Sequence, residues 1–267
     1  MSRVTKVSVD GADLHVDVDG EGHAVLFLHG MGCDATDWEP QMQAFRGTFR
    51  CIAVDHRGHG RSTRDVGAGL SLSGLADDAV AVLDALGVDT AHVVGLSMGG
   101  MVAQQLALAH PDRVCTLSLL DTFSDPGPLG DGLGAMADSV EAAGIDALAG
   151  AFEQLVFAAN TRSERPELLA RFDQQFRSND AAALAADLRA IADIDTHEKL
   201  GSIRVPTLVV VGAEDQLTPV DRGEILAKEI PEARFEVIPS AGHFTNLEQP
   251  DAVNRLLARH FAHDRQH

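Results

Sequence analysis

Six short apolar runs, rich in β-branched residues, constrain the fold of this chain more than any other feature. Runs of this length and type are typical of strands that are buried on both faces of a parallel sheet. Amphipathic stretches that end at a glycine or before a proline separate most of them. The predicted strands are residues 24–28, 51–54, 91–95, 114–120, 207–211 and 234–238, and the clearest helices are residues 75–86, 101–109, 219–230 and 252–261.

The alternation of strands and helices predicts an α/β fold with a doubly wound, mostly parallel sheet. Before the first buried strand, apolar and polar residues alternate in two runs that flank Asp10-Gly11, and this pattern predicts an antiparallel hairpin. Right-handed crossovers then place helices on both faces of the sheet, and the functional loops follow the carboxyl ends of the strands.

The interval 122–195 interrupts this order because it lacks a run typical of a strand. Two sets of apolar residues in it follow helical spacing, one after Pro166 and one at Leu184, Leu188 and Ile191. A linker rich in proline and glycine, residues 125–132, precedes them. The interval 122–195 is therefore predicted to be an inserted helical lid, which leaves residues 1–121 and 196–267 as the core.

A possible nucleophile lies where the third buried strand ends. Gly95-Leu96-Ser97-Met98-Gly99 joins this strand to the next helix. A sharp turn with glycines on either side would hold the serine hydroxyl exposed above the sheet, as in a nucleophile elbow. A serine that only caps a helix is the other explanation of the same turn. Ser97 is therefore a candidate nucleophile that needs a base elsewhere in the chain.

An acid and a histidine follow Ser97 in the order that this chemistry requires. Asp215 comes directly after the strand at 207–211, and His243 comes directly after the strand at 234–238. A neutral imidazole can take the proton of the serine hydroxyl, and a carboxylate can orient that imidazole. Asp121 also ends a strand and is the alternative acid. The sequence thus predicts Ser97, His243 and Asp215 as a catalytic triad.

Two backbone amides are predicted to bind the oxyanion of the reaction. His29-Gly30-Met31-Gly32 follows the first buried strand, which places the N–H of Met31 opposite that of Met98. A tight glycine turn with no catalytic role is the alternative. His29, His56 and His59 are expected to be turn and packing histidines, and Cys33 is expected to be a passive thiol near the pocket.

Charge and cysteine content limit the partners that the chain could bind. The formal net charge is −19, which would repel nucleic acid and anionic membrane surfaces. No apolar run reaches the roughly 18 residues of a membrane span. The three cysteines lack metal-ligand spacing, and neither a phosphate loop nor a dinucleotide motif is present. We expect a cytoplasmic protein with no cofactor, no metal and a small-molecule substrate; its oligomeric state is not predicted.

The motifs together resemble those of the α/β-hydrolase superfamily over nearly the whole chain, and their residues are most similar to those of the 3-oxoadipate enol-lactonases. The resemblance rests on His29-Gly-Met-Gly32, Asp55-His-Arg-Gly-His-Gly-Arg-Ser62, Gly95-Leu-Ser-Met-Gly-Gly100, Gly212-Ala-Glu-Asp215, Ala241-Gly-His243 and the residues that follow His243. It implies a serine hydrolase that cleaves a small carboxylic ester or lactone through an acyl-enzyme on Ser97.

The enol-lactonase resemblance also implies a substrate that carries a carboxylate and is bound by the lid. The arginines available there are Arg162, Arg165, Arg171 and Arg177, and the sequence favours none of them. A C–C-bond hydrolase and a perhydrolase would use the same triad. A ligand receptor that keeps the fold but turns over slowly or not at all is a further alternative.

Overall fold

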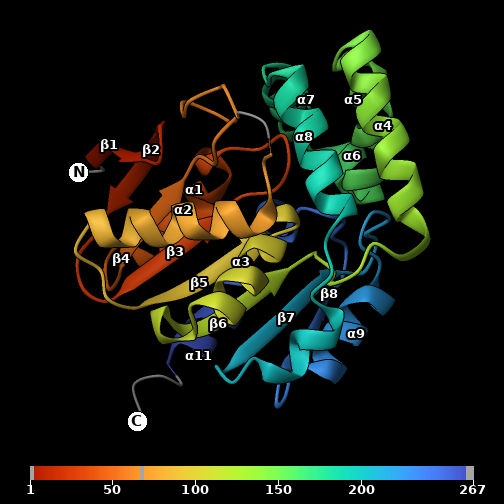
Figure 1. Cartoon of the computed structure of the whole chain (residues 1–267). Coiled ribbons are helices and arrows are strands. Elements are labelled where there is room, and N and C mark those ends of the chain that lie inside the picture. The colour runs from red at the N-terminus through yellow and green to blue at the C-terminus, as the bar shows by residue number, and fades with distance from the viewer. Residues whose placement is uncertain (1–2, 67–68, 263–267) are drawn as a thin grey trace.

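The computed structural model describes residues 3–66 and 69–262, and within them one eight-stranded sheet forms the centre of the molecule (Figure 1). The strand order is β1-β2-β4-β3-β5-β6-β7-β8. The first hairpin is antiparallel, as is its junction with β4, and all other neighbouring strands are parallel. The strands are β1 (Arg3–Val9), β2 (Ala12–Asp19), β3 (Ala24–Leu28), β4 (Arg50–Val54), β5 (Ala91–Leu96), β6 (Val114–Leu120), β7 (Thr207–Gly212) and β8 (Arg234–Ile238).

Helices cover both faces of the sheet, which confirms the predicted fold class. Alternate residues of β3 face opposite sides: Leu26 and Leu28 pack in one apolar cluster, and Val25 and Phe27 pack in the other. The first cluster contains α2 (Leu72–Ala85), α3 (Met98–Ala109) and α9 (Val220–Glu229), and the second contains α1 (Glu39–Phe45), α10 (Thr245–Glu248) and α11 (Pro250–Phe261). Short 3-10 helices, η1 (Ala35–Trp38), η2 (Pro111–Arg113) and η4 (His197–Ser202), lie in the connections.

Local capping explains where the helices begin and end. α2 starts at Leu72, three residues before the predicted start, because the hydroxyl of Ser71 accepts a hydrogen bond from the amide of Gly74 and so caps the first turn. α3 starts at Met98, directly after Ser97, and α11 starts at Pro250, where proline has no amide to leave unpaired.

Five helices connect β6 to β7, in a segment that the structure describes throughout: α4 (Gly130–Ala143), α5 (Asp146–Val156), α6 (Ala159–Glu164), α7 (Pro166–Arg177) and α8 (Ala181–Ala192), after the 3-10 helix η3 (Gly127–Leu129). Figure 1 shows them standing beyond one end of the sheet. The predicted linker 125–132 ends earlier than expected, since α4 begins at Gly130. α4 packs along α8, and this contact outweighs the helix cost of about 1 kcal/mol for each glycine.

The interval 122–195 is thus helical, while its division from the core as a lid stays a prediction. None of the helices that the structure describes combines the length and the apolar character needed to cross a membrane.

Candidate active site

Ser97 occupies a strained turn between β5 and α3. Its backbone has φ 53° and ψ −118°, a conformation that costs a residue with a side chain on the order of 1–3 kcal/mol. The turn is held from both sides, because the amide of Ser97 donates to the carbonyl of Leu120 (2.9 Å) and the hydroxyl of Thr122 donates to the carbonyl of Ser97 (2.8 Å). The surrounding structure therefore fixes the geometry of a nucleophile elbow.

Gly95 and Gly99 allow the strand, the turn and the helix to approach one another this closely. A Cβ on Gly95 would lie 2.2 Å from the carbonyl oxygen of Gly99, and a Cβ on Gly99 would lie 2.1 Å from the carbonyl oxygen of Leu28. These obstacles are backbone atoms, so they could not move aside without shifting the sheet. Both positions require glycine for the reason that the sequence pattern indicated.

Asp215 and His243 come together from the ends of β7 and β8. Oδ2 of Asp215 lies 2.9 Å from Nδ1 of His243 and accepts a hydrogen bond from the Thr218 hydroxyl (2.5 Å). Oδ1 of Asp215 accepts hydrogen bonds from the amides of Leu217 (2.8 Å) and Thr218 (2.9 Å). The backbone amide of His243 donates to the carbonyl of Val156 in α5 (2.7 Å). The helical insertion thus holds the histidine loop directly.

The electrostatics of this pair favour a charged carboxylate beside a basic imidazole. Burial alone would raise the pKa of Asp215, but His243 and the Thr218 donors outweigh burial, so the pKa of Asp215 is lowered. Burial would likewise lower the pKa of His243, but the charge of Asp215 and its hydrogen bond raise the pKa of His243. The imidazole is therefore a stronger base than a free histidine.

Asp121, the alternative acid, is buried behind the pair and contacts both of its loops. Its Oδ1 accepts from the amide of Gly212 (2.9 Å), and its Oδ2 accepts from the amide (3.2 Å) and the hydroxyl (2.5 Å) of Thr245. Burial and then the neighbouring charge of Asp215 raise the pKa of Asp121 well above its usual range. Its oxygens are occupied by these donors, whereas Nδ1 of His243 contacts Asp215.

The two amides predicted to bind an oxyanion lie in suitable segments. Met98 is the first residue of α3, so its N–H belongs to the helical turn that has no acceptor within the helix. Met31 lies in a turn closed by a hydrogen bond from the amide of Cys33 to the carbonyl of Gly30 (3.2 Å). A Cβ on Gly30 would lie 3.3 Å from Cβ of Ser97, so this turn lies against the elbow. Their role as oxyanion donors stays a prediction.

Three histidines lie beneath the turn that contains Met31. Nδ1 of His29 lies 2.8 Å from the carbonyl oxygen of Gly30, and Nε2 of His29 accepts a hydrogen bond from the amide of His56 (2.9 Å). Burial, followed by the charge of His59, lowers the pKa of His29 to about 3, so this ring is neutral. These contacts fit the turn and packing roles expected of His29 and His56.

His59 has a partner that sequence reasoning missed. Its Nε2 lies 3.2 Å from the amide nitrogen of Gly32 and 3.0 Å from Oδ2 of Asp187 in α8, and both side chains are buried. Asp187 falls on the buried face of α8 with Leu184 and Leu188. In the sequence, the position of this carboxylate on an apolar helix face could have indicated a buried ion pair, but nothing there identified His59 as its partner.

Ser97 and His243 face a common cavity of about 330 Å³. Its wall comes from the turn after β3, the loop after β7 and the helices α4, α5, α7 and α8. Most of the lining side chains are methionine, leucine, isoleucine or phenylalanine, and Cys33 borders it as expected. Besides Ser97 and His243, the polar side chains in the lining are Gln216 and Thr218.

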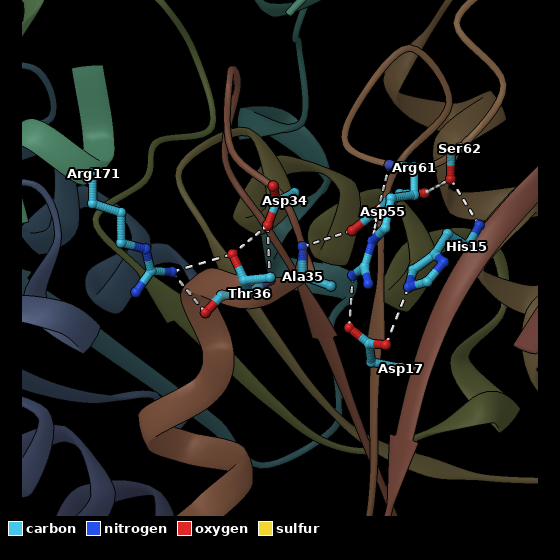
Figure 2. A network of polar contacts seen from close by, with 9 residues as sticks. All are labelled: His15, Asp17, Asp34, Ala35, Thr36, Asp55, Arg61, Ser62 and Arg171. Atoms are coloured by element: carbon cyan, nitrogen blue, oxygen red, sulfur yellow. Dashed lines mark hydrogen bonds and ion pairs between the residues drawn. The ribbon is translucent and has the colours of Figure 1, made fainter. Parts of the chain in front are cut away.

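Among the residues that the structure describes, no arginine or lysine lines this cavity. Arg171 donates instead to the carbonyl of Thr36 (2.8 Å) and to Asp37 (3.0 Å), and Figure 2 shows its guanidinium turned toward η1 in a polar network that continues to Asp55 and Arg61. The other three candidate arginines also have partners: Arg162 contacts the carbonyls of Gln154 and Phe157, Arg165 contacts that of Leu247, and Arg177 pairs with Asp146 and Asp173.

Groups of three or more His, Cys, Asp or Glu side chains that could hold a metal ion are absent from the described part of the chain. The potential reactive groups of the cavity are therefore the serine, the histidine with its carboxylate, and the Cys33 thiol. Burial, and after it the charge of Asp37, raises the pKa of Cys33 well above its usual range, which keeps this thiol protonated.

A family model described as the alpha/beta hydrolase fold matches residues 23–250. The chain belongs to the α/β-hydrolase family. It is 32% identical to 3-oxoadipate enol-lactonase 1 of Acinetobacter baylyi, with 97% of both chains covered. A thermophilic esterase from Thermogutta terrifontis shares 29% identity and a TM-score of 0.92, covering 98% of this chain and 99% of the esterase.

A third relative is Est816, whose structure is described as that of an N-acyl homoserine lactone degrading enzyme. It shares 38% identity and a TM-score of 0.84, covering 95% of this chain and 99% of Est816. These matches confirm the resemblance to the α/β-hydrolases and to enol-lactonase-like relatives that the motifs indicated. This chain is a hydrolase.

Proposed function

We propose that this hydrolase cleaves neutral carboxylic esters or lactones, with Ser97 as nucleophile, His243 as general base and Asp215 as the acid that orients it. The observation that carries the proposal is the cavity. It combines the elbow serine and the carboxylate-paired histidine with an apolar wall. The order of the three residues along the chain and the ester or lactone names of the relatives support the same chemistry.

The reaction has two steps that use the same groups. Asp215 accepts a hydrogen bond from Nδ1–H of His243, which keeps the imidazole proton on Nδ1 and leaves Nε2 able to take the proton of the Ser97 hydroxyl. The serine oxygen attacks the carbonyl carbon, and the amides of Met31 and Met98 donate to the resulting oxyanion. His243 returns the proton to the departing alkoxide, which yields the acyl-enzyme. Water, deprotonated by His243, then releases the acid and restores Ser97; with a lactone, acid and alcohol leave as one molecule.

The cavity favours a neutral substrate over the carboxylate-bearing one that the sequence resemblance implied. A carboxylate that enters an apolar site without a cation loses its hydration, and this costs several kcal/mol. The four candidate arginines have partners outside the cavity lining. The net charge of −19 would also disfavour the approach of an anion.

The nucleophile can be tested by covalent labelling with a neutral alkyl phosphonate ester of 4-nitrophenol. Intact-protein mass spectrometry should show one added phosphonyl group on the parent and none on Ser97→Ala. Cys33→Ala is the matched control because it removes the other nucleophilic atom of the cavity, and this variant should still be labelled. Labelling that survives in Ser97→Ala and disappears in Cys33→Ala would overturn the assignment.

Substrate charge can be tested with two esters of equal chain length, 4-nitrophenyl octanoate and the 4-nitrophenyl monoester of suberic acid. They differ in one terminal carboxylate. We expect kcat/KM to be at least about 10-fold higher for octanoate, since the carboxylate would lose part of its hydration against the apolar cavity wall or its apolar rim with no cation beside it. Equal or faster turnover of the suberate ester would reject a neutral substrate class while leaving the nucleophile unaffected. An N-octanoyl homoserine lactone, also neutral, extends the comparison to a lactone ring.

A cytoplasmic location stays part of the proposal. The buried Cys33 and Cys51 are not joined in a disulfide, as is usual in a reducing compartment. Fractionation of cells that express the full chain, followed by immunoblotting, tests it.

A further inference from the structure

One face at the start of α4 lines the active-site cavity. Leu129 precedes the helix, and Gly132, Leu133 and Met136 follow at spacings of three, four and seven residues from it. Residues at these spacings share one face of a helix. This face, which we call the α4 face, contributes three long apolar side chains and, between them, one position with no side chain.

The α4 face is an apolar part of the cavity wall that is also exposed to solvent. Leu129 is 48% exposed and Met136 is 37% exposed, while both also line the cavity. Large apolar side chains with this exposure are few among the residues that the structure describes. An apolar rim around the entrance of an apolar cavity indicates a site that receives apolar ligand atoms.

Gly132 lies between these two side chains and is itself exposed. A Cβ built on Gly132 would meet no other atom within 4 Å. The glycine is therefore not required by a close approach of backbone, in contrast to Gly95 and Gly99. At this position the missing side chain leaves open space that continues the cavity toward solvent.

We propose that an apolar chain attached to the scissile ester or lactone leaves the cavity across Gly132, between Leu129 and Met136, and that Gly132 determines how long a chain the enzyme accepts. The inference rests on the proposed function, because it places a part of the same substrate. It narrows the substrate class to neutral esters or lactones with a linear apolar chain of medium length. Gly132 is a specificity-determining position and takes no part in the chemistry.

The test is the substitution Gly132→Leu, with Gly134→Leu as the matched control. Gly134 lies in the same helix, a Cβ on it also meets no atom within 4 Å, and it is not among the cavity-lining residues. Both substitutions remove a glycine from α4, so both should raise the melting temperature slightly and to a similar degree. Equal melting temperatures would show that the two variants differ in the cavity alone.

Two series of esters vary the position of the chain. A series of 4-nitrophenyl esters varies its length on the acyl side, and a series of alkyl acetates varies its length on the alcohol side. In one of the two series, Gly132→Leu should lower kcat/KM for the octyl-length member about 10-fold or more relative to the methyl-length member, since a leucine fills space that several methylenes would occupy. Gly134→Leu should leave this ratio unchanged. A ratio that is unaffected by Gly132→Leu in both series, or changed equally by the two variants, would overturn the proposal.

Binding of N-octylacetamide, an inert neutral amide, separates this inference from the proposed function. Isothermal titration calorimetry should show about 10-fold weaker binding to Gly132→Leu than to Gly134→Leu, whether or not Ser97 is the nucleophile. Selective weakening, together with ester hydrolysis that persists in Ser97→Ala, would support the chain path and reject the mechanism. Equal affinities, together with unchanged chain-length ratios in both ester series and hydrolysis that depends on Ser97, would reject the chain path and leave the mechanism intact.

Discussion

Asp215→Asn should remove nearly all activity while keeping the two backbone amide contacts that shape its loop. The asparagine can keep its side-chain oxygen toward the amides of Leu217 and Thr218, which now donate to Oδ1 at 2.8 and 2.9 Å. Its NH₂ group then replaces Oδ2 at 2.9 Å from Nδ1 of His243. Because that group donates, Nδ1 must accept, and the imidazole proton moves to Nε2. The histidine can then no longer take the proton of Ser97.

A wrong histidine tautomer in a serine triad costs on the order of 10⁴ in kcat, equivalent to about 5.4 kcal/mol of transition-state stabilisation. This loss is several times the net worth of one ordinary hydrogen bond, about 1 kcal/mol. Asp121→Asn is the matched control, because Asp121 is also a buried carboxylate with three donors but contacts Gly212 and Thr245 instead of the imidazole. It should lower the melting temperature and change kcat less than about 10-fold.

Both variants and the parent can be compared by initial rates on 4-nitrophenyl octanoate and by thermal unfolding. The reasoning predicts a large loss of kcat at an almost constant melting temperature for Asp215→Asn, and the opposite pattern for Asp121→Asn. If Asp121→Asn lost more activity than Asp215→Asn, the triad acid would be Asp121. Losses of only a few-fold in both variants would refute a histidine oriented by either carboxylate.

Three further predictions concern pH, stability and substrate form. Because the pKa of His243 is raised by Asp215, kcat/KM for a neutral ester should fall as pH decreases through a midpoint above the ordinary histidine value of about 6.5, and a pH–rate profile with a midpoint below that value would contradict it. Burial disfavours the charged form of His59, but the charge of Asp187 outweighs burial and raises the pKa of His59. The His59–Asp187 pair therefore stabilises the fold fully below about pH 6.5, and this stabilisation is lost as pH rises through the raised pKa of His59. Urea unfolding should therefore show Asp187→Asn to be more destabilised relative to the parent at about pH 6 than at about pH 9, and an equal difference would reject the pair. Dissolved short esters should be hydrolysed faster than emulsified long-chain esters, since residues of α4, α5, α7 and α8 line the cavity and limit it to about 330 Å³; faster release of acid from emulsions, measured by titration, would indicate that these helices open at interfaces.

Local signals were sufficient for the sheet and the elbow, but not for every helix. The strands at Ala24–Leu28, Val114–Leu120 and Arg234–Ile238 have the predicted bounds because turn residues flank short apolar runs. α1 (Glu39–Phe45) was missed because it has two buried residues, Gln41 and Phe45, which are too few to form a period.

Predicting the cavity from the sequence was harder, because its wall is built from helices with weak local signals. α4 contains Gly130, Gly132 and Gly134 near its start, and glycine disfavours a helix wherever packing does not compensate. α8 supplies that packing from about 50 residues further along the chain. Leu129 and Gly132 of the α4 face therefore fall in the predicted linker, which ends before Leu133 and Met136, and the sequence does not locate the entrance of the cavity.

Predicting the charge of the substrate from the sequence was also hard, because it depends on long-range contacts. Along the sequence, nothing distinguishes Arg171 from the other candidate arginines of the helical insertion, whereas in the structure it donates to Asp37 at 3.0 Å, across 134 residues of chain. Burial and then the charge of Asp34 raise the pKa of Asp37 to about 6, and Arg171 opposes this rise. If Arg171 turned into the cavity to bind a substrate carboxylate, the buried carboxylate of Asp37 would be left without its cation, which is unfavourable. The contact with Asp37 thus holds Arg171 away from the substrate, and this is a physical reason why the motifs alone imply an anionic ligand while the cavity favours a neutral one.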